Sequence, residues 1–523
     1  MSACLFNRPL LPVDETRYVS VAWEMWVRHD FLVPYLNGEV YSHKPPLLFW
    51  LIQLSWWFFG VNDWALRWIV PLFSLASIAL SYLAAGLLWP QRPIIKELVV
   101  FILPSSIFWM AYSSLTMFDM ILTCIVLMGM CSLLQLQRNF LSLRWWGVYG
   151  LAIAGGLLCK GPVVLLHLLP VALLAPWWHS GAIQGGWILW YRNLAYAVLL
   201  GIAMALCWAI PAGIAGGSSY RNEIFFGQTS GRLIESFAHQ LPWWWYAQNF
   251  PLVLLPWVIW QPVWHGVKTL SLKEPQTRFC LAWLVPIFIT FSLISGKRLH
   301  YLLPILPSIT LLLAYVLESV VADKVAWQRW HRNMMMGFAI MGAVVALMPT
   351  LEAFEWQREL ALISPWWPSL ITIAAIAALW LKVHDVRYAV FFVSNISAFS
   401  FILLVLGFFQ INAYRYDTQP LAQKLAKFMA DGQAVAFYTT KYYGQYQFTG
   451  RLDKSITVLS DAKQLVHWAK QHQIGHFMVI YKEIGQMDEQ LLAAHYPFRN
   501  QNIGLISSLT LLRNPDLALT FKP

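Results

Sequence analysis

The chain has 523 residues, of which 59% are hydrophobic and only 12% are charged, and its formal net charge is +11. Soluble domains contain about 25% charged residues, so this composition excludes a soluble globular protein and indicates a polytopic membrane protein. The positive charge does not indicate nucleic-acid binding, because the basic residues cluster in short connections between apolar segments, a pattern that sets membrane orientation.

The first charged stretch of the chain is Asp-Glu-Thr-Arg-Tyr at residues 14–18. Asp14 follows a proline turn and is expected to cap a helix that ends near Arg28, with its carboxylate at the mouth of the helix. This helix is amphipathic, which predicts that it lies in the membrane interface. Its polar side carries Arg17, Glu24 and Arg28, and its apolar side carries Val19, Ala22, Trp23 and Trp26.

The next apolar segment, residues 47–59, is too short to cross a bilayer and is predicted to be re-entrant or interfacial. Lys44 lies at the joint between these two surface-lying helices. A carboxylate and an ammonium group in this position suggest the rim of a membrane active site. The alternative interpretation is a solvated connecting loop.

Beyond residue 63, apolar segments alternate with short polar connections, which predicts about twelve membrane crossings. The segments are 64–89, 97–113, 117–136, 145–159, 161–178, 193–215, 246–264, 279–295, 299–321, 334–350, 366–381 and 388–411. Every second connection is basic, and the positive-inside rule places these connections in the cytoplasm. They carry Arg92/Lys96, Arg138/Arg144, Arg192, Lys268/Lys273/Arg278, Lys324/Arg329/Arg332 and Lys382/Arg387. The other connections, including 1–63 and 216–245, and the tail after 411 are expected on the opposite face.

This topology predicts that ionisable groups from distant parts of the chain gather near the outer face. They are Asp14, Asp119, Lys160, Arg221, Arg232, Lys297 and Arg298. Ionisable groups at membrane depth are costly, so their convergence suggests a functional site. Structural roles are the alternatives: Asp119 would cap its helix, Lys160 would anchor a tight turn, and Arg221 would pair with Glu223.

Residues 412–523 differ in character from the transmembrane domain at 1–411. Predicted helices at 420–431, 461–472 and 486–495 alternate with predicted strands at 434–438, 456–459, 476–480 and 505–512. This alternation is typical of an α/β domain with a small, partly parallel sheet. We expect it outside the membrane, where it would cover or shape the site.

A set of motifs in the first 300 residues resembles the GT-C glycosyltransferases of the protein O-mannosyltransferase and aminoarabinose lipid A transferase group. The motifs occur in the family's order, and the C-terminal α/β domain is similar to that of the lipid A branch. They are Asp14-Glu15-Thr16-Arg17-Tyr18, Leu36-Asn37-Gly38, Lys44-Pro45-Pro46-Leu47-Leu48-Phe49-Trp50, Phe118-Asp119, Lys160-Gly161-Pro162, Gly227-Gln228-Thr229 with Arg232, His239 with Pro242-Trp243-Trp244-Trp245-Tyr246, and Lys297-Arg298-Leu299-His300-Tyr301-Leu302-Leu303-Pro304. Family members usually have one more transmembrane helix before the first motif.

The resemblance implies roles for most of these polar residues. Asp14 would be the central carboxylate, with Asp119 as the second and Glu15 beside it. The donor phosphate would be bound by Lys44, Arg232, Lys297, Arg298 and Tyr301, since such cations act where negative charge develops. Arg17, Tyr18, His43, Lys160, His239 and His300 would complete the pocket. Relatives often have Glu before the lysine and Tyr in place of His300; with His43 in the Glu position, this chain would hold a divalent metal through imidazole or bind none.

The implied function is transfer of a sugar from a polyprenyl phosphate to a lipid A phosphate, a glycan or a protein hydroxyl, with inversion of the anomeric centre. If the acceptor is a hydroxyl, Asp14 would be the general base; a phosphate acceptor is already ionised near neutral pH. No sugar nucleotide or nucleic acid is expected, and the protein would lie in a bacterial inner membrane with its site facing the periplasm. The alternative is a transporter or flippase for a lipid-linked sugar.

Overall fold

The computed structural model describes residues 5, 7–181, 185–226, 241–350, 363–482 and 489–521. Contacts within the chain divide it into two compact units. The first, the helical unit, comprises Met1–Leu5, Ser42–Leu48 and Asn62–Gly407. The second, the mixed unit, comprises Phe6–Tyr41, Phe49–Val61 and Phe408–Pro523. Each unit is described by itself.

The helical unit is built from apolar helices, and seven described helices of the chain are long and apolar enough to cross a membrane. They overlap the expected segments at 64–89, 117–136, 193–215, 279–295, 299–321, 334–350 and 388–411, although the helix Lys324–Leu347 begins ten residues before its predicted start. The corresponding elements are α4 (Asp63–Leu88), α7 (Phe118–Arg138), α11 (Gly186–Ala215), α16 (Pro275–Leu293), η3 (Leu299–Ile305) with α17 (Leu306–Glu318), α18 (Lys324–Leu347) and α21 (Val386–Tyr416). The predicted polytopic helical fold is confirmed.

Of the other five expected segments, one is a continuous helix and four are short or interrupted. Segment 97–113 is α5 (Pro93–Ser105) and α6 (Ile107–Ser113), bent by 66°. Segment 145–159 is α8 (Leu143–Lys160), and 161–178 is α9 (Val163–Leu173) with α10 (Ala175–Trp178). Segment 246–264 divides into α14 (Trp245–Val253), η2 (Trp257–Ile259) and α15 (Gln261–Val267), and 366–381 is α20 (Trp366–Ala378). Prolines within and between these pieces remove backbone donors, which explains the breaks.

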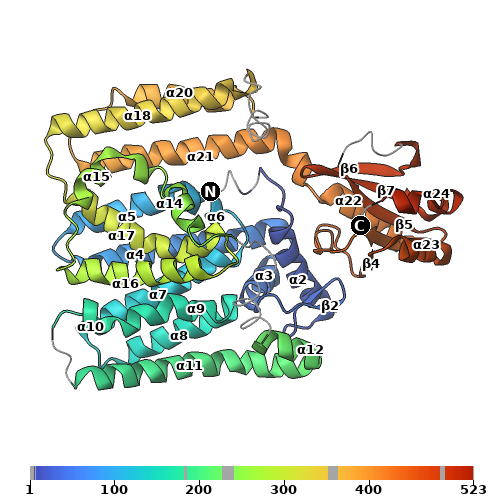
Figure 1. The fold of residues 1–523 in the computed structure, drawn as a ribbon, viewed down its shortest axis with the longest axis horizontal. Coiled ribbons are helices and arrows are strands. Elements are labelled where there is room, and N and C mark those ends of the chain that lie inside the picture. The colour runs from blue at the N-terminus through green and yellow to red at the C-terminus, as the bar shows by residue number, and fades with distance from the viewer. Residues whose placement is uncertain are drawn as a thin grey trace. The chain divides into compact units, whose positions relative to one another are not determined.

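Helix α7 is the centre of the helical unit. It packs against α4 and α8, and α8 in turn packs against α11 (Figure 1). Nearly every residue of α7 is buried, which explains why its sequence is apolar on all sides. Short elements complete the described part of this unit: α12 (Gly217–Asn222) and η4 (Met348–Thr350). Arg221 in α12 and the nearby Glu223 are both exposed.

The mixed unit contains a five-stranded sheet in the order β4-β3-β5-β7-β6. The strands are β3 (Val435–Tyr438), β4 (Thr457–Leu459), β5 (His476–Tyr481), β6 (Ala494–Phe498) and β7 (Gln501–Ser507). Strand β3 pairs in parallel with β4 and β5, whereas β7 pairs antiparallel with β5 and β6. The predicted partly parallel sheet is therefore confirmed.

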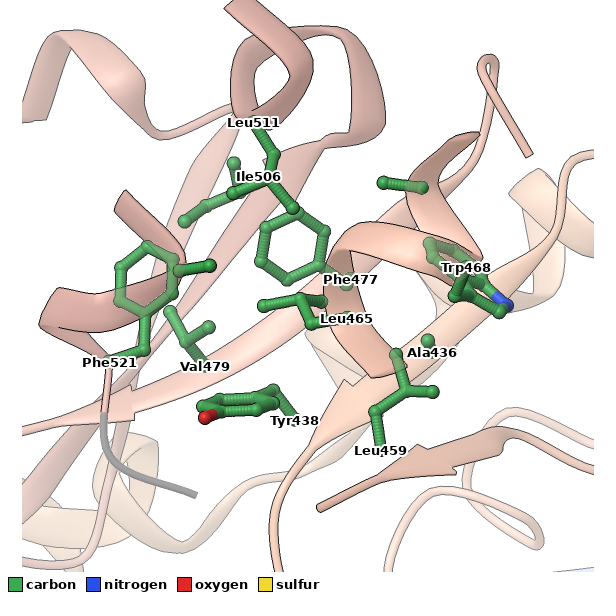
Figure 2. Packing of buried hydrophobic residues seen from close by; sticks show 12 residues of the cluster. Ala436, Tyr438, Leu459, Leu465, Trp468, Phe477, Val479, Ile506, Leu511 and Phe521 are labelled. Carbon is green, nitrogen blue, oxygen red and sulfur yellow. The ribbon is translucent and has the colours of Figure 1, made fainter. Parts of the chain in front are cut away.

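Alternate residues of the strands enter two hydrophobic cores. Ala436 and Phe477 face a core with α23 (Ala462–Gln471), α24 (Ser508–Arg513) and α25 (Leu517–Thr520), which Figure 2 shows. Phe437 and Met478 face the other core, together with α22 (Gln419–Ala430). Because successive side chains of a strand point to opposite faces, the sheet packs against helices on both faces.

Two C-terminal predictions were wrong. The expected helix at 486–495 lies partly outside the described residues, and the remainder is η6 (Glu489–Leu491) and the start of strand β6. The expected strand at 505–512 ends at Ser507, whose side-chain oxygen accepts a hydrogen bond from the Thr510 backbone N–H at 3.1 Å. This N-cap starts α24 and ends the strand.

The beginning of the chain belongs to the same unit as the sheet. Helix α2 (Asp14–Arg28) forms as predicted, but its N-cap is Val13, so the expected capping role of Asp14 was wrong. Part of its apolar side, which was predicted to lie in the membrane interface, contacts other segments of the mixed unit. Trp23 donates a hydrogen bond to the Leu452 carbonyl at 2.8 Å, and Trp56 of α3 (Leu47–Phe59) stacks on Phe448 at 5.2 Å.

A hairpin of β1 (Tyr35–Leu36) and β2 (Glu39–Val40) joins these helices. Its two turn residues, Asn37 and Gly38, have positive φ angles of 56° and 88°, the conformation that favours Asn-Gly in a two-residue turn. The Asn37 amide bonds to both the N–H and the C=O of Ile456, at 2.7 and 2.9 Å, and accepts from Gln447 at 2.8 Å. One side chain thus joins the hairpin to the C-terminal part of the unit.

Candidate functional site

The helical unit contains a group of polar residues at helix ends, which we call the charged cluster: Lys44, Asp119, Lys160, His300 and Tyr301. Asp119 is the second residue of α7 and Lys160 is the last residue of α8. A carboxylate near a helix N-terminus and an ammonium group at a C-terminus are each favoured by the helix dipole. Gly161 then turns the chain with a φ of 76°, which glycine adopts without strain.

Lys160 and Asp119 form an ion pair in which both side chains are buried. The ammonium group of Lys160 also lies 4.7 Å from the centre of the Tyr301 ring, within range of a cation–π interaction. The N-cap residue of α7 is Met117 and no side-chain cap is formed there, so the alternative of a capping role for Asp119 was wrong. A buried ion pair is costly to desolvate, so its position calls for a structural or functional reason.

His300 lies next to this pair in η3. Its Nδ1 atom is 3.5 Å from the Tyr112 hydroxyl on α6. Lys44, Lys160 and Asp119 all act on the His300 ring electrostatically, as does Arg298. Lys44 and His300 likewise act on the Asp119 carboxylate. Five of the residues predicted from the sequence are thus brought together in one unit.

The charged cluster is rich in positive charge. Its members Lys44 and Lys160 and the adjacent Arg298 are three cations that act on His300 together with the Asp119 carboxylate. The backbone of Arg298 is held by the Tyr246 hydroxyl, which accepts from its N–H at 3.2 Å and donates to its C=O at 3.0 Å. Several cations close together are suited to binding an anion.

The ammonium group of Lys297 is bound by backbone carbonyls and does not take part in the charged cluster. It is 2% exposed, and its Nζ atom donates to the backbone carbonyls of Leu241, at 3.0 Å, and of Ile294. Burial lowers the pKa of this ammonium group. These contacts tie the connection before η3 to the segment that precedes α14, which is a structural role.

The mixed unit holds a second predicted group. Asp14 forms an ion pair with Arg17, and both side chains are only partly buried. The Arg17 guanidinium lies 5.1 Å from the ring centre of Tyr18 and 5.7 Å from that of Tyr443. Tyr443 was not among the residues predicted from the sequence, because nothing local indicates that it meets α2.

Glu15 differs from its neighbour Asp14. It is buried, and its carboxylate pairs with Arg8, with an Nη2–Oε1 distance of 3.0 Å. It also accepts the Leu11 backbone N–H at 2.9 Å. These bonds fold the segment before α2 back onto the helix. Arg8 was not among the predicted residues, because its only signal in the sequence is a lone charge before a Pro-rich turn.

The remaining predicted residues divide into two groups. His43 is exposed in the connection before α3. Arg232 and His239 lie outside the described residues. Within the described ranges, no group of three or more His, Cys, Asp or Glu side chains is arranged to hold a metal ion.

Comparison with known proteins supports the resemblance seen in the motifs. Residues 43–210 match the family described as dolichyl-phosphate-mannose-protein mannosyltransferase. The undecaprenyl phosphate-alpha-4-amino-4-deoxy-L-arabinose arabinosyl transferase 2 of Pseudomonas fluorescens is 29% identical over 58% of this chain and 55% of its own length. The corresponding transferase of Edwardsiella ictaluri is 27% identical over 65% of this chain and 62% of its own length.

Solved structures support the fold. The crystal structure of ArnT from Cupriavidus metallidurans in the apo state has a TM-score of 0.78 at 17% identity, covering 97% of this chain and 96% of that one. The same protein bound to undecaprenyl phosphate has a TM-score of 0.74 at 18% identity, with 96% and 95% covered. The predicted similarity to the GT-C group is confirmed, while the sequence matches span less than two thirds of the first curated relatives' lengths.

Proposed function

We propose that this chain, which has the GT-C fold, is an integral-membrane glycosyltransferase that uses a polyprenyl-phosphate sugar as donor. The observation that carries the proposal is the gathering of three cations around His300, where Lys44, Lys160 and Arg298 act together with the Asp119 carboxylate. Phosphate is the anion that a lipid-linked sugar brings to the membrane, and preorganised cations stabilise it as it leaves. The names of the curated relatives favour undecaprenyl phosphate as the carrier and 4-amino-4-deoxy-L-arabinose as the sugar.

The reaction breaks the bond between the anomeric carbon and the phosphate oxygen, and the electron pair leaves with the phosphate. An acceptor oxygen forms the new bond to the anomeric carbon from the opposite face, which inverts its configuration. The products are the glycosylated acceptor and polyprenyl phosphate. Lys44 is the proposed phosphate ligand in the cluster, with Lys160 held beside it by Asp119 and Tyr301.

Asp14 is the proposed catalytic carboxylate, as the family resemblance implies. For a hydroxyl acceptor it would take up the proton; for a lipid A phosphate it would orient the acceptor or stabilise positive charge on the sugar ring. Its ion pair with Arg17 holds the carboxylate at the start of α2. Glu15 has a positioning role in this proposal, since its oxygens are bonded to Arg8 and Leu11. Arg232 and His239 remain predicted pocket residues.

We place the protein in the bacterial inner membrane with its catalytic residues and residues 412–523 on the periplasmic side. Support comes from the alternation of basic and non-basic connections along the sequence. The acceptor is a lipid A phosphate, a glycan or a protein hydroxyl, and the lipid A phosphate is favoured by the relatives' sugar. A periplasmic orientation predicts that cysteines introduced in the tail after 416 react with a membrane-impermeant thiol reagent in intact cells with a permeable outer membrane.

The test is product formation by purified protein in lipid nanodiscs with undecaprenyl-phosphate aminoarabinose and lipid A. The unmodified chain should form glycosylated lipid A and release undecaprenyl phosphate, both visible by mass spectrometry. Lys44→Ala should reduce turnover at least about a hundredfold, the scale for loss of a preorganised charge in a transition state. Lys382→Ala, at an exposed lysine outside the cluster, is the matched control. Translocation of the donor with no new glycosidic bond would instead identify a transporter.

A further inference from the structure

A second group of cations in the helical unit lies around a cavity that the proposed transferase activity does not use. The cavity has a volume of about 430 Å³, within the range of small-ligand sites. It is lined by the first turns of α18 and by the connection that follows α20, through Lys324, Gln328, Arg329, Arg332, Asn333 and His384.

The walls of this cavity are built by specific hydrogen bonds. Gln328 donates to the Leu381 carbonyl at 3.0 Å and accepts from the Val383 N–H at 2.8 Å. Its amide therefore fixes the connection against α18 and positions the neighbouring His384. On the other side, Asn333 donates to Gln261 of α15 at 3.2 Å.

The cations of the cavity can be compared with the carboxylates in the described part of the chain. Among the residues that the structure describes, none forms an ion pair with Lys324, Arg329 or Arg332. The nearest acids in sequence have other roles: Asp323 caps α18 by accepting the Ala326 N–H, and Asp385 accepts the Arg387 and Tyr388 N–H groups. The cavity therefore attracts an anion.

The same side of α18 continues as an apolar stripe. Following Val325, Arg329 and Arg332 at helical spacing, the exposed side chains are Met336, Ile340, Val344 and Leu347. The stripe from Arg332 to Leu347 is roughly 22 Å long at 1.5 Å per residue, which matches an extended acyl chain. A cationic head region followed by an apolar stripe on one helix fits an amphipathic molecule better than a free anion.

We propose that this cavity binds the phosphate headgroup of an anionic phospholipid, with an acyl chain along the α18 stripe. Lys324, Arg329 and Arg332 bind the phosphate, and His384 closes the site from the facing connection. Basic pockets between membrane helices on the cytoplasmic side are suited to such headgroups. By the positive-inside rule the start of α18 and the connection after α20 face the cytoplasm, so the lipid would belong to the cytoplasmic leaflet.

The test is native mass spectrometry of the full-length protein released from nanodiscs that contain phosphatidylcholine and cardiolipin. The unmodified protein should retain cardiolipin, and the double variant Arg329→Gln/Arg332→Gln should retain it about 25-fold more weakly, since each cation near an anionic lipid contributes about fivefold. The matched control is Lys268→Gln/Lys273→Gln, which removes the same charge from exposed lysines of another basic connection.

Two further measurements distinguish a bound phospholipid from a bound inorganic anion. Ile340→Ser, on the stripe, should weaken cardiolipin retention while leaving the charges in place. Inorganic phosphate at millimolar concentration should not displace the lipid. Equal losses in the two double variants would overturn the site, because binding would then follow net charge alone. If inorganic phosphate displaces the lipid and Ile340→Ser has no effect, the proposed phospholipid site would be refuted. The cavity would then be a site for free phosphate. Either result is independent of the transferase assay.

Discussion

At the scale of single residues, the adjacent acids Asp14 and Glu15 have different surroundings, although both belong to one sequence motif. Asp14 is partly exposed and paired with Arg17, whereas Glu15 is buried and bonded to Arg8 and Leu11. The sequence predicts that both are polar residues at the start of α2. It does not predict which one is buried, because that depends on where the preceding segment folds.

We predict that the variants Asp14→Asn and Glu15→Gln separate catalysis from stability. Asp14→Asn should lower the rate of product formation at least about a hundredfold. Its melting temperature should change little. Glu15→Gln keeps an acceptor for Leu11 but loses the buried ion pair, so it should lower the melting temperature and retain measurable turnover. Both are measured by product assay and thermal unfolding of the purified protein in detergent. Full activity of Asp14→Asn would contradict the assignment.

The buried pair Asp119–Lys160 gives a second residue-scale prediction. Lys160→Met leaves a carboxylate buried without its partner, which should destabilise the protein by about 3–5 kcal/mol. The double variant Asp119→Asn/Lys160→Met removes both charges and should recover most of that loss. Thermal unfolding of the single and double variants measures the coupling. Equal melting temperatures for the two would show that the pair is not formed in the folded protein.

At the scale of elements, most long apolar helices were predicted well, even where they contain one proline, such as Pro71 in α4 or Pro286 in α16. A segment with three prolines was not. The segment 246–264 has the composition of one span but contains Pro251, Pro256 and Pro262, and it folds as three short helices. The composition of a segment indicates only how apolar it is. A proline removes a backbone donor and can change the direction of the chain, and composition does not show where this happens. The boundary between β7 and α24 was missed for a related reason: one serine cap decides it.

The β1–β2 hairpin provides the element-scale prediction. Asn37 makes hydrogen bonds to Ile456 and Gln447 from a residue with positive φ. Asn37→Ala removes these bonds and strains the turn, so it should destabilise the mixed unit by about 2–3 kcal/mol. Asn37→Gly should cost less, since it loses the bonds but tolerates the conformation. Hydrogen exchange of the amides at 447–457, followed by mass spectrometry, should rank the two in this order; the reverse order would refute the role of the turn conformation.

At the scale of the whole molecule, the sequence predicted both the polytopic helical fold and the α/β sheet. It did not predict that residues 6–41 and 49–61 belong to the same compact unit as the C-terminal sheet. The contacts responsible join residues more than 400 positions apart, such as Trp23 with Leu452. Hydrophobic periodicity indicates the type of each element separately. It does not indicate which distant elements will be in contact.

The sheet of the mixed unit should respond to pH through His476. Its ring stacks on Phe428 at 4.0 Å, and burial together with the nearby Lys424 charge lowers its pKa. The folded protein therefore holds His476 neutral at a pH where the unfolded chain, with a histidine pKa of about 6.5, already takes up a proton. The stabilising contribution is fully present above pH 6.5 and is lost as the pH falls from there toward the lower folded-state pKa.

Hydrogen exchange of the β5 amides in the intact protein, corrected for intrinsic rates, measures this effect. Protection should fall between pH 7.5 and pH 5.5 in the unmodified chain and in His467→Gln, which changes an exposed histidine of α23. It should fall less in His476→Gln, which has no proton to gain. If all three proteins lose protection equally, the pH dependence arises elsewhere in the unit. A difference confined to His476→Gln assigns the pH dependence to the residue where α22 meets β5, because burial against the Phe428 ring disfavours an imidazolium there.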